Sequence, residues 1–131
     1  MARIRQDDFI ASIADALQFV SYYHPQDYIE ALGEAYRAEE SPAAKDAIAQ
    51  ILTNSRLCAE GHRPLCQDTG IVVAFVKVGM GVQWDGLSLS IAEMVNAGVR
   101  RAYLDPDNTL RASIVADPAG ARKNTKDNTP A

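Results

Sequence analysis

Apolar residues recur at three- and four-residue steps through most of the first 52 residues, a spacing that places them on one face of an α-helix. This pattern predicts helices over residues 6–22, 26–38 and 42–52. His24-Pro25 separates the first two, because the residue before a proline is disfavoured in helical conformation. Ser41-Pro42 suits the start of the third, since serine caps free amide groups and proline fits the first turn. The expected inward-facing residues are Phe9, Ile10, Ile13, Ala14, Leu17 and Val20, then Tyr28, Ile29, Leu32, Ala35 and Tyr36, then Ala44, Ile48, Ile51 and Leu52.

The pattern changes in the second half of the chain. Residues 54–70 are polar and aperiodic, which predicts a long ordered loop. Residues 71–78 are β-branched and almost wholly apolar, as expected for a strand buried on both faces, and residues 82–84 are suited to pair as a short second strand. A fourth helix is expected over residues 88–104, with Leu89, Ala92, Val95, Val99 and Tyr103 inward. We therefore expect an α+β fold, mostly helical, in which N-terminal helices precede a small sheet and a further helix.

Composition is that of one globular domain: 131 residues, of which 47% are hydrophobic and 23% charged. We divide it into a helical part, 1–54, and a part that holds the polar loop, the strands, the last helix and a polar C-terminal segment, 55–131. The net charge of -4 and a pI near 5.1 argue against nucleic acid or an anionic membrane as partner. No signal sequence or membrane-spanning run is recognisable, which predicts a cytoplasmic protein.

Two cysteines, Cys58 and Cys66, are too few for a disulfide framework and are expected to be thiols. Their spacing does not match a structural zinc site, and only His24 and His62 are available to complete one.

Most of the available chemistry is concentrated in Cys66-Gln67-Asp68-Thr69-Gly70. Cys66 has three interpretations: a buried structural thiol, a nucleophile activated by a histidine, or a ligand of a soft metal centre such as an iron-sulfur cluster. The polar neighbours argue against a core position, and no local signature places a histidine beside the thiol. A cluster would need further ligands, from Cys58 or from polypeptide outside this sequence.

Four blocks carry a resemblance to a known family: residues 66–70, 96–103, 110–115 and 122–131. In this order and spacing they resemble the N-terminal part of the iron-sulfur (class I) fumarate hydratases, a family that includes the α subunit of L(+)-tartrate dehydratase. The resemblance covers residues 56–131 most specifically.

The resemblance implies a role for each matching residue. Cys66 would be one of three cysteines that hold a 4Fe-4S cluster, while Gln67, Asp68 and Arg111 would contact a dicarboxylate substrate and Asp68 would also be the candidate catalytic residue. Chemistry agrees with these roles, because amides and guanidinium groups bind carboxylates and a carboxylate can carry a proton. Candidates for a supporting role behind these residues are His62, Thr69, Gly70, Asn124, Thr125 and Asn128. Cys58 is expected to be structural.

The implied reaction is reversible hydration of fumarate to malate, a step of the tricarboxylic acid cycle, in a homo- or hetero-oligomer. Dehydration of L(+)-tartrate is the alternative within the same class, and a stand-alone interaction or assembly module with a structural cysteine loop is the alternative outside it. The sequence stops at Thr129-Pro130-Ala131 without a capping element, which suggests a fragment or a subunit. We expect it to be inactive without the missing C-terminal part or partner subunit, because one or two thiolates cannot replace three.

Overall fold

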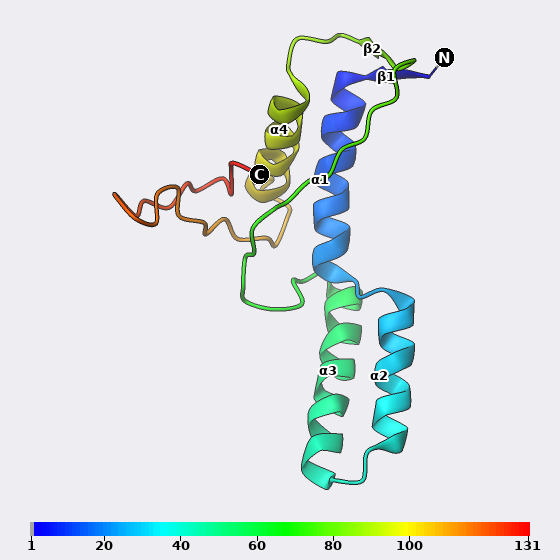
Figure 1. The fold of residues 1–131 in the computed structure, drawn as a ribbon. Coiled ribbons are helices and arrows are strands. Elements are labelled where there is room, and N and C mark those ends of the chain that lie inside the picture. Colours follow the sequence, from blue (N-terminus) through cyan, green and yellow to red (C-terminus); the bar gives the residue numbers. More distant parts are fainter. Residues whose placement is uncertain (1) are drawn as a thin grey trace. The chain divides into compact units, whose positions relative to one another are not determined.

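The computed structural model describes residues 2–131 and consists of four helices and a two-stranded sheet (Figure 1). About half of the chain is helical, which confirms the predicted α+β, mostly helical class. In the described residues no helix is both long and apolar enough to span a membrane. The elements are β1 (Arg3–Arg5), α1 (Gln6–Tyr22), α2 (Gln26–Ala38), α3 (Pro42–Gly61), β2 (Gln83–Asp85) and α4 (Ile91–Leu104).

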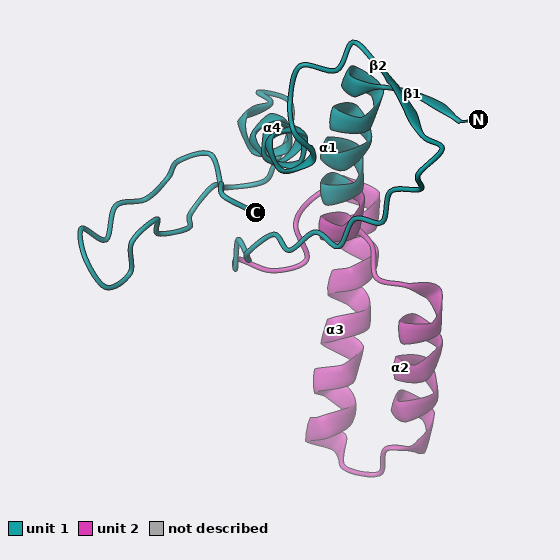
Figure 2. Ribbon diagram, turned by 45° about the horizontal axis from the view of Figure 1, so that its top comes forward, with its two compact units in different colours: residues 1–18, 68–131 teal, residues 19–67 magenta. Residues whose placement is uncertain are grey.

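The chain forms two compact units (Figure 2). The first unit, teal in the figure, contains residues 1–18 and 68–131; the second, magenta, contains residues 19–67. Helix α1 begins in the first unit and ends in the second.

The second unit is built around a hairpin of α2 and α3, which lie side by side in both views. The predicted bounds of α1 and α2 are confirmed, and α3 begins at Pro42 as expected. The predicted end of α3 near residue 52 is wrong: the helix continues to Gly61, so residues 54–61 are not loop. The buried face of α3 continues through Ser55 and Cys58. Neither side chain is aliphatic, so the apolar periodicity in the sequence ended before the helix did.

Fewer residues of the first three helices are buried than the apolar periodicity predicted. Five residues expected to face inward are more than a third exposed: Val20, Tyr28, Ala35, Tyr36 and Ile51. Helix α2 has no fully buried residue. An amphipathic stripe shows which face of a helix is apolar, but not how completely that face is covered.

In the first unit, β1 and β2 pair in parallel, with Ile4 opposite Trp84. The predicted strand over 82–84 is confirmed with a shift of one residue, whereas β1 was not predicted, because three residues are too short for a periodic signal. The Trp84 ring packs edge-to-face on Phe9 of α1, with ring centroids 5.4 Å apart. The Gln6 side-chain oxygen accepts hydrogen bonds from the backbone N–H groups of Ser88 and Leu89.

Helix α4 starts at Ile91, three residues later than predicted, because Ser90 is its N-cap. The Ser90 hydroxyl accepts the backbone N–H of Glu93, and the Glu93 carboxylate accepts the backbone N–H of Ser90. The hydrogen bonds that the Glu93 carboxylate accepts from the Ser90 backbone N–H and from the Ser90 hydroxyl lower the pKa of this carboxyl. The buried face of α4 consists of Met94, Val95, Gly98, Val99 and Ala102; of the predicted inward residues, Ala92 is exposed and Leu89 precedes the helix.

The predicted buried strand over residues 71–78 is wrong. The segment is irregular, and Ile71, Val73 and Phe75 are 76%, 68% and 96% exposed. A strand needs a neighbour that accepts and donates its ladder hydrogen bonds. Within residues 2–131 the only ladder of named strands is that of β1 and β2. Sequence propensity correctly marks these residues as apolar, but it does not supply the partner.

Candidate functional site

The segment that leads to Cys66 is held by two hydrogen bonds within the second unit. The backbone N–H of Leu65 donates to the Ser21 carbonyl oxygen at 2.9 Å, and the Asn54 side-chain amide donates to the Leu65 carbonyl oxygen at 2.9 Å. The residue before the thiol is therefore anchored to α1 and α3, and the position of Cys66 follows from that anchor.

His62 ends α3 in a left-handed conformation, with φ of 46°. Its ring stacks on Tyr22 at a centroid distance of 5.8 Å, and its Nε2 lies 3.0 Å from the Tyr23 hydroxyl oxygen. These contacts fix the direction in which the chain leaves α3. They support a loop-shaping role for His62.

The two cysteines differ in environment. Cys58 is buried, and its Sγ lies 3.4 Å from the Pro64 carbonyl oxygen, so it is a packed thiol with an acceptor. Cys66 is an exposed thiol, accessible to a metal centre. In the described part of the chain no three His, Cys, Asp or Glu side chains gather in a metal-binding group. Among the described residues Cys66 could therefore supply one thiolate to a metal centre but not a complete ligand set.

In the first unit, Asp68, Thr69 and Gly70 form a turn whose main chain is held from several sides. The Asp68 carboxylate accepts the backbone N–H of Gly70 at 3.0 Å. Gly70 has φ of 70°, a conformation that favours glycine. The Tyr103 hydroxyl of α4 donates to the Thr69 carbonyl oxygen at 3.2 Å. Burial raises the pKa of Tyr103.

Asn128 connects this turn to the block of residues 110–115. Its side chain is fully buried; the amide nitrogen donates to the Gly70 carbonyl oxygen at 3.3 Å, and the amide oxygen accepts the backbone N–H of Ser113 at 3.2 Å. Asn128 itself has φ of 61°. The structure thus brings together Gly70, Asn128 and the segment that carries the exposed Arg111.

The C-terminal block, residues 122–131, also contacts the block of residues 110–115 through its main chain. Val115 and Asn124 form an antiparallel bridge, and the Thr125 backbone N–H donates to the Ile114 carbonyl oxygen at 3.0 Å. The buried hydroxyl oxygens of Thr69 and Thr125 have no hydrogen-bond partner among the described residues. They are exceptions to the general rule that a buried hydroxyl is satisfied by a hydrogen bond.

Asp127 anchors the C-terminal block to α4, a contact that the sequence analysis did not identify. Its carboxylate accepts hydrogen bonds from the Arg100 guanidinium at 3.0 Å and from the Thr129 backbone and hydroxyl. Burial alone would raise the pKa of Asp127, but these hydrogen bonds and the Arg100 charge hold it below its ordinary value. The Asp-x-Thr spacing of a local side-chain turn is the signal that would have indicated part of this arrangement.

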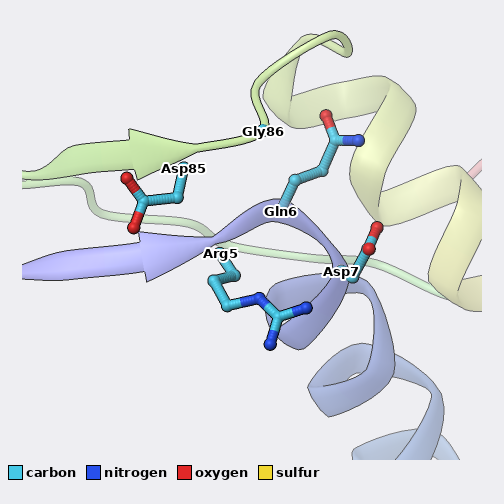
Figure 3. A pocket seen from close by; sticks show the side chains of 5 residues that line it. All are labelled: Arg5, Gln6, Asp7, Asp85 and Gly86. Carbon is cyan, nitrogen blue, oxygen red and sulfur yellow. The ribbon is translucent and has the colours of Figure 1, made fainter.

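An open pocket of about 360 Å³ lies at the start of α1 and the end of β2 (Figure 3). Its lining residues are Arg5, Gln6, Asp7, Asp85 and Gly86. None of them is a predicted site residue, and Gln6 is engaged in holding residues 88 and 89.

The motif turn of this α+β chain is thus bonded to two segments that lie far from it in the sequence, α4 and the C-terminal segment. The sequence model of the fumarate hydratase (fumerase) family matches residues 10–131. The chain belongs to this family of hydro-lyases, which confirms the resemblance found in the sequence.

The chain is also similar to α subunits of tartrate dehydratase. A protein of Methanocaldococcus jannaschii with the provisional name L(+)-tartrate dehydratase subunit alpha is 32% identical over 103 residues, which are 79% of this chain and 35% of that protein. The L(+)-tartrate dehydratase subunit alpha of Escherichia coli strain K12 and that of Shigella boydii are each 26% identical over 118 residues, 90% of this chain and 38% of theirs. The chain therefore spans little more than a third of the length of these relatives.

Proposed function

We propose that this chain is part of an iron-sulfur hydro-lyase that reversibly adds water to fumarate to give malate. The observation that carries the proposal is the pair of Asn128 hydrogen bonds, to Gly70 and to the backbone of Ser113. They join the motif turn to the segment of Arg111 within one unit, as a shared substrate site for Asp68 and Arg111 would require. Family membership supports the reaction class.

Each proposed substrate contact follows from the chemistry of its side chain. Arg111, an exposed guanidinium, binds one substrate carboxylate through two parallel hydrogen bonds, and the Gln67 amide donates to a carboxylate oxygen. The Asp68 carboxylate accepts or delivers the proton that the reaction moves. The reaction balances without an oxidant: fumarate and water give malate, with hydroxide and a proton added to neighbouring carbons.

Cys66 is the proposed thiolate ligand of a 4Fe-4S cluster, completed by cysteines of the missing polypeptide or partner subunit. When bound, an iron with an open position would polarise the substrate as a Lewis acid. Cys66 suits this role because its thiol is exposed, whereas Cys58 is packed against the Pro64 carbonyl and is proposed to be structural. The chain alone is proposed to be inactive, and a cytoplasmic location remains a prediction.

Dehydration of L(+)-tartrate to oxaloacetate is a second candidate. It is favoured by the names of the relatives, which are tartrate dehydratase α subunits. The two substrates are four-carbon dicarboxylates, so the roles of Arg111 and Gln67 are the same in both.

The test compares variants after anaerobic iron-sulfur reconstitution of the chain together with the remaining part of the enzyme. We expect Cys66→Ser to lose cluster iron and activity, while the matched control Cys58→Ser keeps both. Arg111→Ala should keep the iron and raise KM for the dicarboxylate at least tenfold, while Arg37→Ala on the exposed face of α2 should leave KM unchanged. Wild-type kcat/KM for fumarate and for L(+)-tartrate decides between the substrates.

Three results would contradict the proposal. They are retention of the cluster in Cys66→Ser, unchanged kinetics in Arg111→Ala, and full turnover by the 131-residue chain without the remaining polypeptide.

A further inference from the structure

Residues 71–78 form the most exposed apolar segment of the first unit. Ile71, Val73 and Phe75 are 76%, 68% and 96% exposed, and Met80 beyond them is fully exposed. Contiguous apolar surface of this kind is rare on a soluble protein unless another polypeptide covers it.

Exposure is continuous along this segment except at its second residue. Ile71 and Val73 are exposed, whereas Val72 between them is half-buried. Farther along, Val76 and Val78 are 41% and 42% exposed, much less than Phe75. Seven of the eight residues are therefore exposed, so the segment offers side chains along almost its whole length to a further polypeptide.

The composition of the segment is that of a central strand. Six of its eight residues are β-branched or aromatic, and Lys77 is its only charge. A central strand has a neighbour on both edges and an apolar layer over its face. Residues 2–131 contain no strand paired with this segment.

We propose that residues 71–78 are a docking strand. Their partner is the polypeptide that corresponds to the rest of the relatives' length, the part that this chain does not cover. That part is large: the chain accounts for 35% of the Methanocaldococcus jannaschii protein and 38% of the Escherichia coli protein. The proposed partner supplies an apolar, β-branched strand that pairs with the main chain of residues 71–78, and apolar side chains that cover Ile71, Val73 and Phe75. This inference concerns assembly and does not depend on which substrate the enzyme uses.

The size of the exposed face favours this occupant over a short peptide. A single added strand would satisfy the main chain at one edge but would leave the outward face in water. Covering that face requires a second layer, which a polypeptide longer than the present chain can provide.

Hydrogen exchange tests the proposal directly. The 131-residue chain is mixed with the remaining part of the protein from its own source organism, produced as a separate polypeptide. Amides of residues 71–78 should exchange rapidly in the isolated chain and at least tenfold more slowly in the mixture. The variant Phe75→Lys should weaken binding at least tenfold, whereas the control Leu57→Lys, at a 54% exposed position of α3, should not.

Phe75 is almost fully exposed, so its substitution does not disturb the folded unit. Two outcomes overturn the proposal. In the first, a complex forms while the amides of residues 71–78 continue to exchange rapidly. In the second, the isolated chain dimerises, and contact with the second copy slows the exchange of these amides. A protected complex without hydro-lyase activity would contradict the proposed function and leave the docking strand standing. An active complex in which residues 71–78 still exchange rapidly would contradict the docking strand and leave the proposed function standing.

Discussion

Gly98 lies where α4 approaches α1 most closely, and Gly98→Ala tests that packing. A Cβ at this position would lie 2.5 Å from Cβ of Ile13 and 2.9 Å from the carbonyl oxygen of Ile10. Ordinary contacts between carbon atoms are about 3.5–4.0 Å. Side-chain rotation can move Cγ2 of Ile13 but not its Cβ, which is fixed by the α1 backbone, and the Ile10 carbonyl belongs to the same backbone, so the helices must separate locally.

Two opposing effects determine the magnitude. Replacing glycine by alanine inside a helix stabilises it by about 1 kcal/mol. Overpacking a close contact costs about 1–3 kcal/mol, and a backbone obstacle favours the upper part of that range. We expect Gly98→Ala to lower the free energy of unfolding by about 1–2 kcal/mol.

The assay uses Trp84, the only tryptophan of the chain, which packs on Phe9 of α1 in the same unit as Gly98. Urea unfolding followed by Trp84 fluorescence should show an earlier midpoint for Gly98→Ala. The control is Gly33→Ala in α2, where the new Cβ would meet only the tip of the Arg37 side chain at 3.6 Å.

Gly33→Ala should stabilise its helix by up to about 1 kcal/mol, as measured by circular dichroism. A Gly98→Ala variant as stable as the wild type, or more stable, would show that α1 and α4 do not approach as closely as the structure indicates.

Three further predictions concern hydrogen bonds of the first unit. Asn128→Ala removes both contacts of a buried amide and should cost about 1–3 kcal/mol, with faster exchange of the Ser113 amide as its local sign. Ser90→Ala removes the N-cap of α4 and should cost about 1 kcal/mol of unfolding free energy, measured by urea unfolding. The lowered pKa of Asp127 means that its bonds, including that from Arg100, stabilise the fold above the ordinary carboxyl pKa of about 3.9 and lose this effect as pH falls through the folded pKa. The stability difference between wild type and Asp127→Asn should therefore be present at pH 7 and shrink in acid; a difference independent of pH would contradict it.

The helices that the sequence predicted well are those with local signals. His24-Pro25 and Ser41-Pro42 fixed the break before α2 and the start of α3, since proline restricts the backbone by itself. The end of α3 was missed because its buried face continues through Ser55 and Cys58. The strand at 71–78 was wrong for a different reason, because a strand is completed by residues distant in sequence, and those were assumed and not identified.

In the candidate site, too, local features could be predicted from the sequence and long-range contacts could not. The turn at Asp68 and Gly70 was predictable, since the residue types and the glycine are contiguous. The contact of Asn128 with Gly70 spans 58 positions, and no periodicity relates them. Only the resemblance of residues 122–131 to a family block pointed to Asn128, and the structure adds the two bonds through which it acts.

These bonds also bear on how substitutions in the motif are interpreted. The carbonyl oxygens of Thr69 and Gly70 accept hydrogen bonds from Tyr103 and Asn128, so two side chains from other elements hold the main chain that follows Asp68. In Asp68→Asn the side-chain amide oxygen can still accept the Gly70 N–H, and the contacts from Tyr103 and Asn128 remain in place. A loss of activity in Asp68→Asn would therefore report on the carboxylate itself, whereas the same loss in Asn128→Ala would report on the position of the turn.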